Sequence, residues 1–158
     1  MLLLRVFIWN DNYAEITTKL TMDFEYIVYT PMMDIEEFLT EVDLVISVLK
    51  DNKVSDIEMY FGFSWGSWES FYSNVLEIKS EIKKQEQITG DSFGENDVYV
   101  VINELETEIV FCHEADIHIE FNRVNKVVSD ILNNWNDRGI IHCIRKNKVD
   151  IEFDMLPL

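Results

Sequence analysis

The chain has 158 residues and a net charge of −17, with 47% hydrophobic and 13% aromatic residues. This length suggests one domain spanning residues 1–158, and the apolar content excludes a disordered chain. The negative charge opposes contact with nucleic-acid phosphates and with anionic membrane surfaces, and it favours a basic partner unless it serves solubility alone.

The charges are distributed unevenly along the sequence. Residues 1–122 carry 25 acidic and 7 basic side chains, whereas residues 123–158 carry 5 acidic and 6 basic ones. Such an asymmetry predicts one acidic face on the folded protein.

The N-terminal run and the cysteines bear on location. The apolar run at residues 2–9 lacks a basic segment before it and a cleavage pattern after it, so it predicts a buried strand rather than a secretion signal. No apolar run is long enough to span a bilayer. Cys112 and Cys143 lie in apolar runs without a CxxC pair, which is typical of free thiols in a reducing cytosol. We therefore expect a cytoplasmic protein.

The first predicted helix follows the two predicted strands 2–9 and 24–30, of which the second is rich in aromatic and β-branched residues. It begins near Asp34, because apolar residues then recur at intervals of three and four, and Asp34 with Glu37 resembles a capping box. Glu41 lies off the apolar stripe, which assigns it to an exposed acidic side of this helix.

The middle of the chain is predicted to contain a strand at 56–63 and a helix at 68–86, with Ser67 as its N-cap. Glycines and acidic residues make 87–97 a loop.

Three short-linked strands follow at 98–102, 107–112 and 116–121, which is typical of an antiparallel meander. A helix begins after Asn122 and ends at Gly139, and 140–145 with 148–153 form a predicted hairpin. Antiparallel strands with helices at irregular intervals indicate an α+β fold, in which about three helices pack on a mainly antiparallel sheet around one core.

The densest polar cluster runs from Cys112 to His118. His113, Asp116 and His118 are metal-ligand types, and they could serve a small metal-dependent or hydrolytic enzyme in which a carboxylate orients His118. Their spacing matches no closed tetrahedral site, and no nucleophile accompanies them. A polar strand face, with His118 hydrogen-bonded to a neighbouring carboxylate, accounts for the same residues. We therefore expect no catalytic residues, no metal and no cofactor.

An aromatic block occupies residues 60–72, where seven of thirteen side chains are aromatic. Alternation predicts that Phe61 and Phe63 are buried, and it makes Trp65 and Trp68 candidates for exposed anchors, although core filling is the alternative role of each ring. Acidic neighbours and the lack of Lys or Arg exclude stacking on nucleic-acid bases.

The segment from Phe111 to Phe121, followed by an amphipathic helix in a small acidic α+β chain, resembles the immunity proteins of bacterial toxin–immunity systems, which include contact-dependent and polymorphic-toxin classes. The resemblance implies a cytoplasmic protein that binds one cognate toxin and blocks it. Many such toxins are nucleases with positive substrate clefts, which an acidic inhibitor can approach rapidly and occupy with carboxylates.

The sequence thus predicts a protein-binding inhibitor and not an enzyme. The residues expected to contact the toxin combine the polar strand face with the aromatic block: Glu114, Asp116, His118, Glu120, Trp65, Trp68 and Glu69. Two other hypotheses stay open, namely the enzyme that uses His113, Asp116 and His118 and a structural subunit whose homo-oligomeric interface covers the aromatic block.

Overall fold

The computed structural model describes residues 24–66 and 68–146. The helices are α1 (Ile35–Asp51), α2 (Ile78–Thr89) and α3 (Lys126–Arg138). The strands are β1 (Tyr26–Tyr29), β2 (Asp56–Phe61), β3 (Phe71–Asn74), β4 (Val98–Ile102), β5 (Thr107–Phe111), β6 (Ile117–Phe121) and β7 (Cys143–Lys146).

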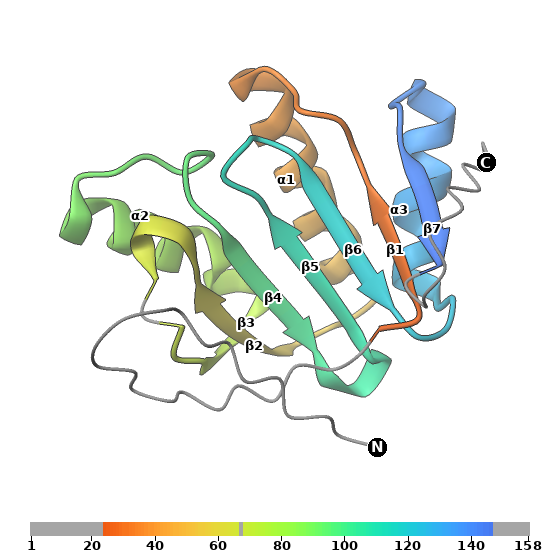
Figure 1. Ribbon diagram of the computed structural model, residues 1–158. Helices are drawn as coiled ribbons and strands as arrows, with labels where there is room; N and C mark the ends of the chain where they lie inside the picture. Colours follow the sequence, from red (N-terminus) through yellow and green to blue (C-terminus); the bar gives the residue numbers. More distant parts are fainter. Residues whose placement is uncertain (1–23, 67, 147–158) are drawn as a thin grey trace, which may run out of the picture.

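The seven strands form one antiparallel sheet in the order β3-β2-β4-β5-β6-β1-β7, and the three helices lie behind it in Figure 1. The predicted α+β fold is therefore confirmed. The meander β4-β5-β6 is also confirmed, and β1 pairs with both β6 and β7. The predicted strands 2–9 and 148–153 lie outside the described residues.

Both helices with a regular apolar stripe begin at a side-chain cap. Asp34 accepts a hydrogen bond from the Glu37 amide at 2.9 Å, as predicted, and α3 begins where Asn125 accepts one from the Val128 amide at 3.1 Å. Gly139 ends α3 at φ 71°, a left-handed conformation that glycine adopts without steric cost. None of the described helices combines the length and the apolar character that a bilayer crossing requires.

The predicted helix 68–86 is wrong in its first half. Residues Phe71–Asn74 form β3, which pairs with β2, and α2 begins only at Ile78. The Asn74 side chain accepts a hydrogen bond from the Leu76 amide, so the chain turns here before α2. Phe, Tyr, Ser and Asn have weak helix propensity, and pairing with an existing strand outweighs it. Residue 67, predicted as the N-cap, lies outside the described residues.

Glu41 is a second correction, because it is 1% exposed and not part of an acidic surface. Its carboxylate accepts hydrogen bonds from Trp135 Nε1 at 2.9 Å and from Arg138 Nη1 at 2.6 Å. A second guanidinium nitrogen of Arg138 also contacts it, so the pair is bidentate. This buried cluster joins α1 to α3.

The sheet has two different faces. The face toward the helices is apolar, and Ile57, Ile109 and Ile119 in it are at most 2% exposed. The opposite face, called the polar face below, carries two rows of cross-strand neighbours. One row contains Glu58, Val101, Glu108, Glu120 and Ile27, and the next contains Tyr60, Tyr99, Val110, His118 and Tyr29.

Candidate functional site

The tight turn between β5 and β6 positions the candidate site. Cys112 donates its amide hydrogen bond to the Asp116 carbonyl at 2.9 Å, and Ala115 donates to the Cys112 carbonyl at 3.1 Å. Ala115 has φ 55°, so the loop matches a three-residue hairpin whose last residue is left-handed. Cys112 and Asp116 are therefore direct cross-strand neighbours.

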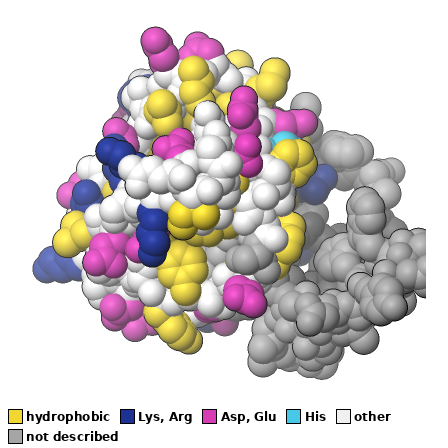
Figure 2. Space-filling model, turned by 90° about the vertical axis from the view of Figure 1, so that its left-hand side faces the viewer, with side chains coloured by type: hydrophobic (Ala, Val, Ile, Leu, Met, Phe, Trp, Pro, Cys, Tyr) yellow, Lys and Arg dark blue, Asp and Glu magenta, His cyan; other side chains and the backbone are white. Residues whose placement is uncertain are grey.

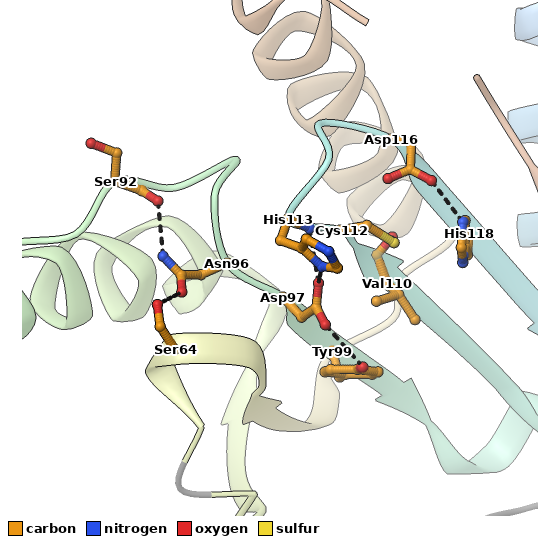
Figure 3. A network of polar contacts seen from close by, with 10 residues as sticks. All are labelled: Ser64, Ser92, Asn96, Asp97, Tyr99, Val110, Cys112, His113, Asp116 and His118. Carbon is orange, nitrogen blue, oxygen red and sulfur yellow. Dashed lines mark hydrogen bonds and ion pairs between the residues drawn. The ribbon is translucent and has the colours of Figure 1, made fainter. Parts of the chain in front are cut away.

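Three side chains of different chemistry meet beside this turn on the polar face. His118 Nε2 lies 2.7 Å from Asp116 Oδ2, and one donor atom each of Cys112, Asp116 and His118 lies within 4.8 Å of the other two (Figure 3). Cys112 is buried and the other two are half-buried. We call these three residues the Cys-Asp-His cluster.

Asp116 carries the cluster's negative charge. Burial raises its pKa, but the hydrogen bond and the positive charge available from His118 outweigh burial, together with weaker hydrogen bonds from the Cys112 thiol and the Asp116 backbone. The pKa of Asp116 therefore lies below its ordinary value. The Asp116 side chain is 14% exposed. Its Oδ1 is buried and meets no described donor in ordinary hydrogen-bond geometry, while the Cys112 thiol is a weak donor to the carboxylate.

The thiol of Cys112 is kept protonated by its surroundings. Burial raises the pKa of Cys112 far above the ordinary value, and the carboxylates of Asp116 and Asp97 raise it further. The reactive form of cysteine is the thiolate, so these surroundings oppose a nucleophilic role. A cation close to the sulfur would reverse this preference, because coordination to a metal deprotonates a thiol.

His113 does not join Asp116 and His118 in one site, so the predicted set His113, Asp116 and His118 is wrong as a ligand group. Its backbone amide and its Nδ1 each lie 2.8 Å from Asp97 Oδ1. Its ring stacks on Phe63, with centroids 4.1 Å apart and planes within 2°. In the part of the chain that the structure describes, Cys112 takes the place that the sequence assigned to His113.

The aromatic block is exposed at different rings from those predicted. Trp65 is 3% exposed and packs edge-on against Phe61, whereas Phe63 is 56% exposed. The strand alternation ends at Gly62, because Phe63 has φ 57° and residues Phe63–Trp65 form a 3-10 turn. Trp65 is thereby excluded as a surface anchor, while Trp68 is 45% exposed as predicted.

The aromatic block and the β5–β6 turn adjoin through ring contacts that the sequence did not predict. Phe63 stacks on His113, and Trp68 lies with its ring centroid 6.0 Å from that of Tyr99. Tyr99 in turn stacks on Tyr60 at 4.1 Å. Burial raises the pKa of both tyrosines, so both act as neutral hydrogen-bond donors.

The other predicted contact residues are spread more widely. Glu114 is exposed at the tip of the turn, and Glu69 is exposed in the connection between β2 and β3. Glu120 lies further along β6, where its cross-strand neighbours are Glu108 and Ile27. The turn therefore unites Asp116 and His118, with Glu114 beside them, but not Glu120.

The predicted ligand set and contact residues omitted Cys112, Asp97 and Phe63. The position of Cys112 could have been predicted. Only three residues separate the predicted strands 107–112 and 116–121, and a three-residue hairpin loop places Cys112 opposite Asp116. Asp97 and Phe63 each contact His113, which is distant in the sequence, so no local pattern predicts these contacts.

One end of the sheet, called the acidic loop end below, is formed by residues 30–37, 90–97, 112–116 and the described part of 62–70. These segments contain no Lys or Arg. Their exposed carboxylates are Asp34, Glu36, Glu37, Glu69, Asp91, Glu95 and Glu114. Their large exposed apolar side chains are Met32, Ile35, Phe63 and Trp68.

Acidic side chains also occur elsewhere. In Figure 2 they are spread over the visible face with hydrophobic side chains between them, and most of the Lys and Arg side chains lie toward the left. The absence of cations from its segments, rather than a single dense patch of acid, therefore distinguishes the acidic loop end.

Comparison with protein-family models, with curated proteins and with solved structures gave no match. The function of this α+β protein therefore has to be argued from its own residues.

Proposed function

We propose that this protein is an acidic inhibitor that binds a basic partner protein through the acidic loop end, and that it acts by binding and not by catalysis. The observation that carries the proposal is the composition of that end. It combines seven exposed carboxylates with four large exposed apolar side chains, and its segments contain no Lys or Arg. Aromatic anchors with a polar rim are typical of protein interfaces, and carboxylates at such a rim would steer a basic partner.

The opposite end of the sheet supports this choice of surface. Exposed cations gather there, among them Lys53, Arg123, Lys126 and Lys146. Three of them form ion pairs with the protein's own carboxylates, as in the contact of Lys146 with Glu25 at 3.2 Å. A basic partner is therefore attracted toward the acidic loop end, and the charge difference orients its approach.

The more specific form of the proposal is an immunity protein that neutralises a cognate bacterial toxin in the cytoplasm of the producing cell. The resemblance described above and the charge of −17 support it. A toxin with a cationic substrate cleft, such as a nuclease, presents the complementary charge. Carboxylates of the loop end would pair with arginines that otherwise bind phosphate.

The experiment compares affinity capture by three forms of the full chain from a lysate of the source cell, at low and at high salt. The first form is the wild type, and the second carries Glu95→Lys and Glu114→Lys. The third is the matched control, with Asp51→Lys and Asp56→Lys at the opposite end. We expect the wild type and the control to retain a basic protein, and the loop-end variant to lose it. Reversing two steering charges lowers the association rate by roughly tenfold.

The captured protein is then expressed alone and together with this chain. Growth arrest that co-expression relieves supports the immunity role. Capture that both variants weaken equally contradicts the proposed surface, and salt-insensitive capture of an acidic protein contradicts the proposed partner.

A further inference from the structure

We propose that Cys112, Asp116 and His118 bind one zinc ion beside the β5–β6 turn. This inference does not rest on the proposed function, because it requires no partner, although Cys112 and Asp116 lie in the segment 112–116 of the acidic loop end.

The donor set fits this metal. Thiolate, imidazole and carboxylate are the three protein ligands that Zn²⁺ uses, and the combination of one sulfur with one nitrogen disfavours Mg²⁺ and Ca²⁺, which prefer oxygen. Three protein ligands leave one position of a tetrahedral site for water.

The geometry requires only small movements. A tetrahedral zinc ion, with bonds of about 2.3 Å to sulfur and about 2.0–2.1 Å to nitrogen and oxygen, needs donor atoms about 3.3–3.6 Å apart. The donor atoms of the cluster already lie within 4.8 Å of one another, and the closest pair, Asp116 and His118, is 2.7 Å apart. Side-chain movements on the order of 1 Å therefore suffice.

The backbone fixes the three donors before any metal binds. Cys112 and Asp116 are cross-strand neighbours closed by the hydrogen bond at 2.9 Å, and His118 follows Asp116 on the same face of β6. The Tyr29 ring lies edge-on to the His118 ring, with centroids 6.1 Å apart, and limits its rotation. Few conformations are lost on binding, which favours affinity.

Asp116 Oδ1 gives a second and independent observation. Asp116 Oδ2 is in contact with His118 Nε2, whereas Oδ1 is buried and meets no described donor in ordinary hydrogen-bond geometry; the Cys112 thiol is a weak donor to the same carboxylate. A buried carboxylate oxygen normally has a partner. A zinc ion would replace the proton shared by Asp116 and His118 and the thiol proton of Cys112, and it would bind one Asp116 oxygen, the Cys112 sulfur and the His118 ring.

The test uses the full chain after removal of any affinity tag. Zinc content is measured by elemental analysis after dialysis, and Co²⁺ is titrated into the metal-free protein. We expect one metal per chain, and a Co²⁺ spectrum with tetrahedral ligand-field bands and a thiolate charge-transfer band. Cys112→Ser is expected to abolish the charge-transfer band. Asp116→Asn and His118→Asn each weaken binding by at least about 100-fold, the upper range for loss of an outer partner of a ligand.

Matched controls are Cys143→Ser and His113→Asn, which remove the same chemical groups outside the cluster and are expected to keep both stoichiometry and spectrum. Circular dichroism of each metal-free variant establishes that it folds, and Asp116→Asn preserves side-chain shape where another variant fails. Substoichiometric metal in the wild type, or equal loss in His113→Asn and His118→Asn, overturns the zinc site. Neither result concerns the charges of Glu95 and Glu114, which the capture experiment tests separately.

Discussion

Glu41 and Asp116 carry largely buried carboxylates on opposite sides of the sheet, and the two carboxylates differ in their hydrogen bonds. Glu41, on the helix side, is 1% exposed and receives hydrogen bonds from Trp135 and a bidentate Arg138. Asp116, on the polar face, keeps 14% of its side chain exposed and has one buried oxygen without an ordinary hydrogen bond from the described residues.

This difference separates a structural carboxylate from a candidate functional one. A buried charge that is fully hydrogen-bonded fixes two elements relative to each other. Removal of either partner leaves a buried polar group without a hydrogen bond, which destabilises the fold. A carboxylate with one oxygen outside ordinary hydrogen-bond geometry and only a weak thiol donor beside it retains the capacity to bind something else. The helix side therefore carries stability, and the polar face and acidic loop end carry the candidate interactions.

The largest expected effect on stability comes from a comparison of buried Trp65 with exposed Phe63. Trp65→Ala removes a buried ring from the core and is expected to lower the free energy of unfolding by about 4 kcal/mol. Phe63→Ala removes an exposed ring that stacks on His113 and is expected to cost about 1 kcal/mol. Urea unfolding of both variants measures the difference. Equal losses would mean that Phe63 belongs to the core.

The next effect tests Glu41 itself. Glu41→Ala leaves Trp135 Nε1 buried without an acceptor, and Arg138 loses its ion pair. Because the Arg138 side chain is 36% exposed and can turn to water, we expect a loss of about 3 kcal/mol, at the lower end for buried pairs. Glu37→Ala, on the exposed side of the same helix, serves as control and should change stability by less than about 0.5 kcal/mol. If Glu41→Ala lowered the free energy of unfolding by less than about 1 kcal/mol, Glu41 would not have the structural role proposed here.

The smallest effect concerns Asp116 in protein kept metal-free by a chelator. Asp116→Ala breaks the hydrogen bond to a half-buried His118 and the weak one from the Cys112 thiol, and it is expected to cost about 1 kcal/mol. Glu114→Ala, at the exposed tip of the same turn, is the control and should be near neutral. Thermal unfolding of the chelated proteins checks this order. If Asp116→Ala proved as costly as Glu41→Ala, both carboxylates would be structural and the comparison would break.

The prediction of the fold succeeded where apolar residues kept a strict period. The helical stripe that ends at Trp135 and the alternation in 116–121 each bury one face, so a shift of one residue would expose the whole apolar set. The prediction failed at 68–74, where the local pattern suited both a helix and a strand. The neighbouring strand β2, and not local propensity, decided between them.

The candidate site was predicted in part. Alternation placed Asp116 and His118 on one face, and the structure confirms this. Cys112 was interpreted as a small hydrophobic residue, because its position opposite Asp116 depends on how the turn closes. Phe63 was predicted to be buried and Trp65 to be exposed, and the structure shows the reverse. The backbone turn at Phe63, which has a positive φ, ends the strand alternation on which that prediction was based.

The sequence by itself determined the class of fold, the acidity and the face of each regular strand, because periodic burial and net charge are summed over many residues. Only the tertiary structure decided which charges are buried and which donors meet. Those outcomes depend on single contacts between segments far apart in the chain, such as Glu41 with Arg138 and His113 with Asp97, and no local pattern encodes such a contact.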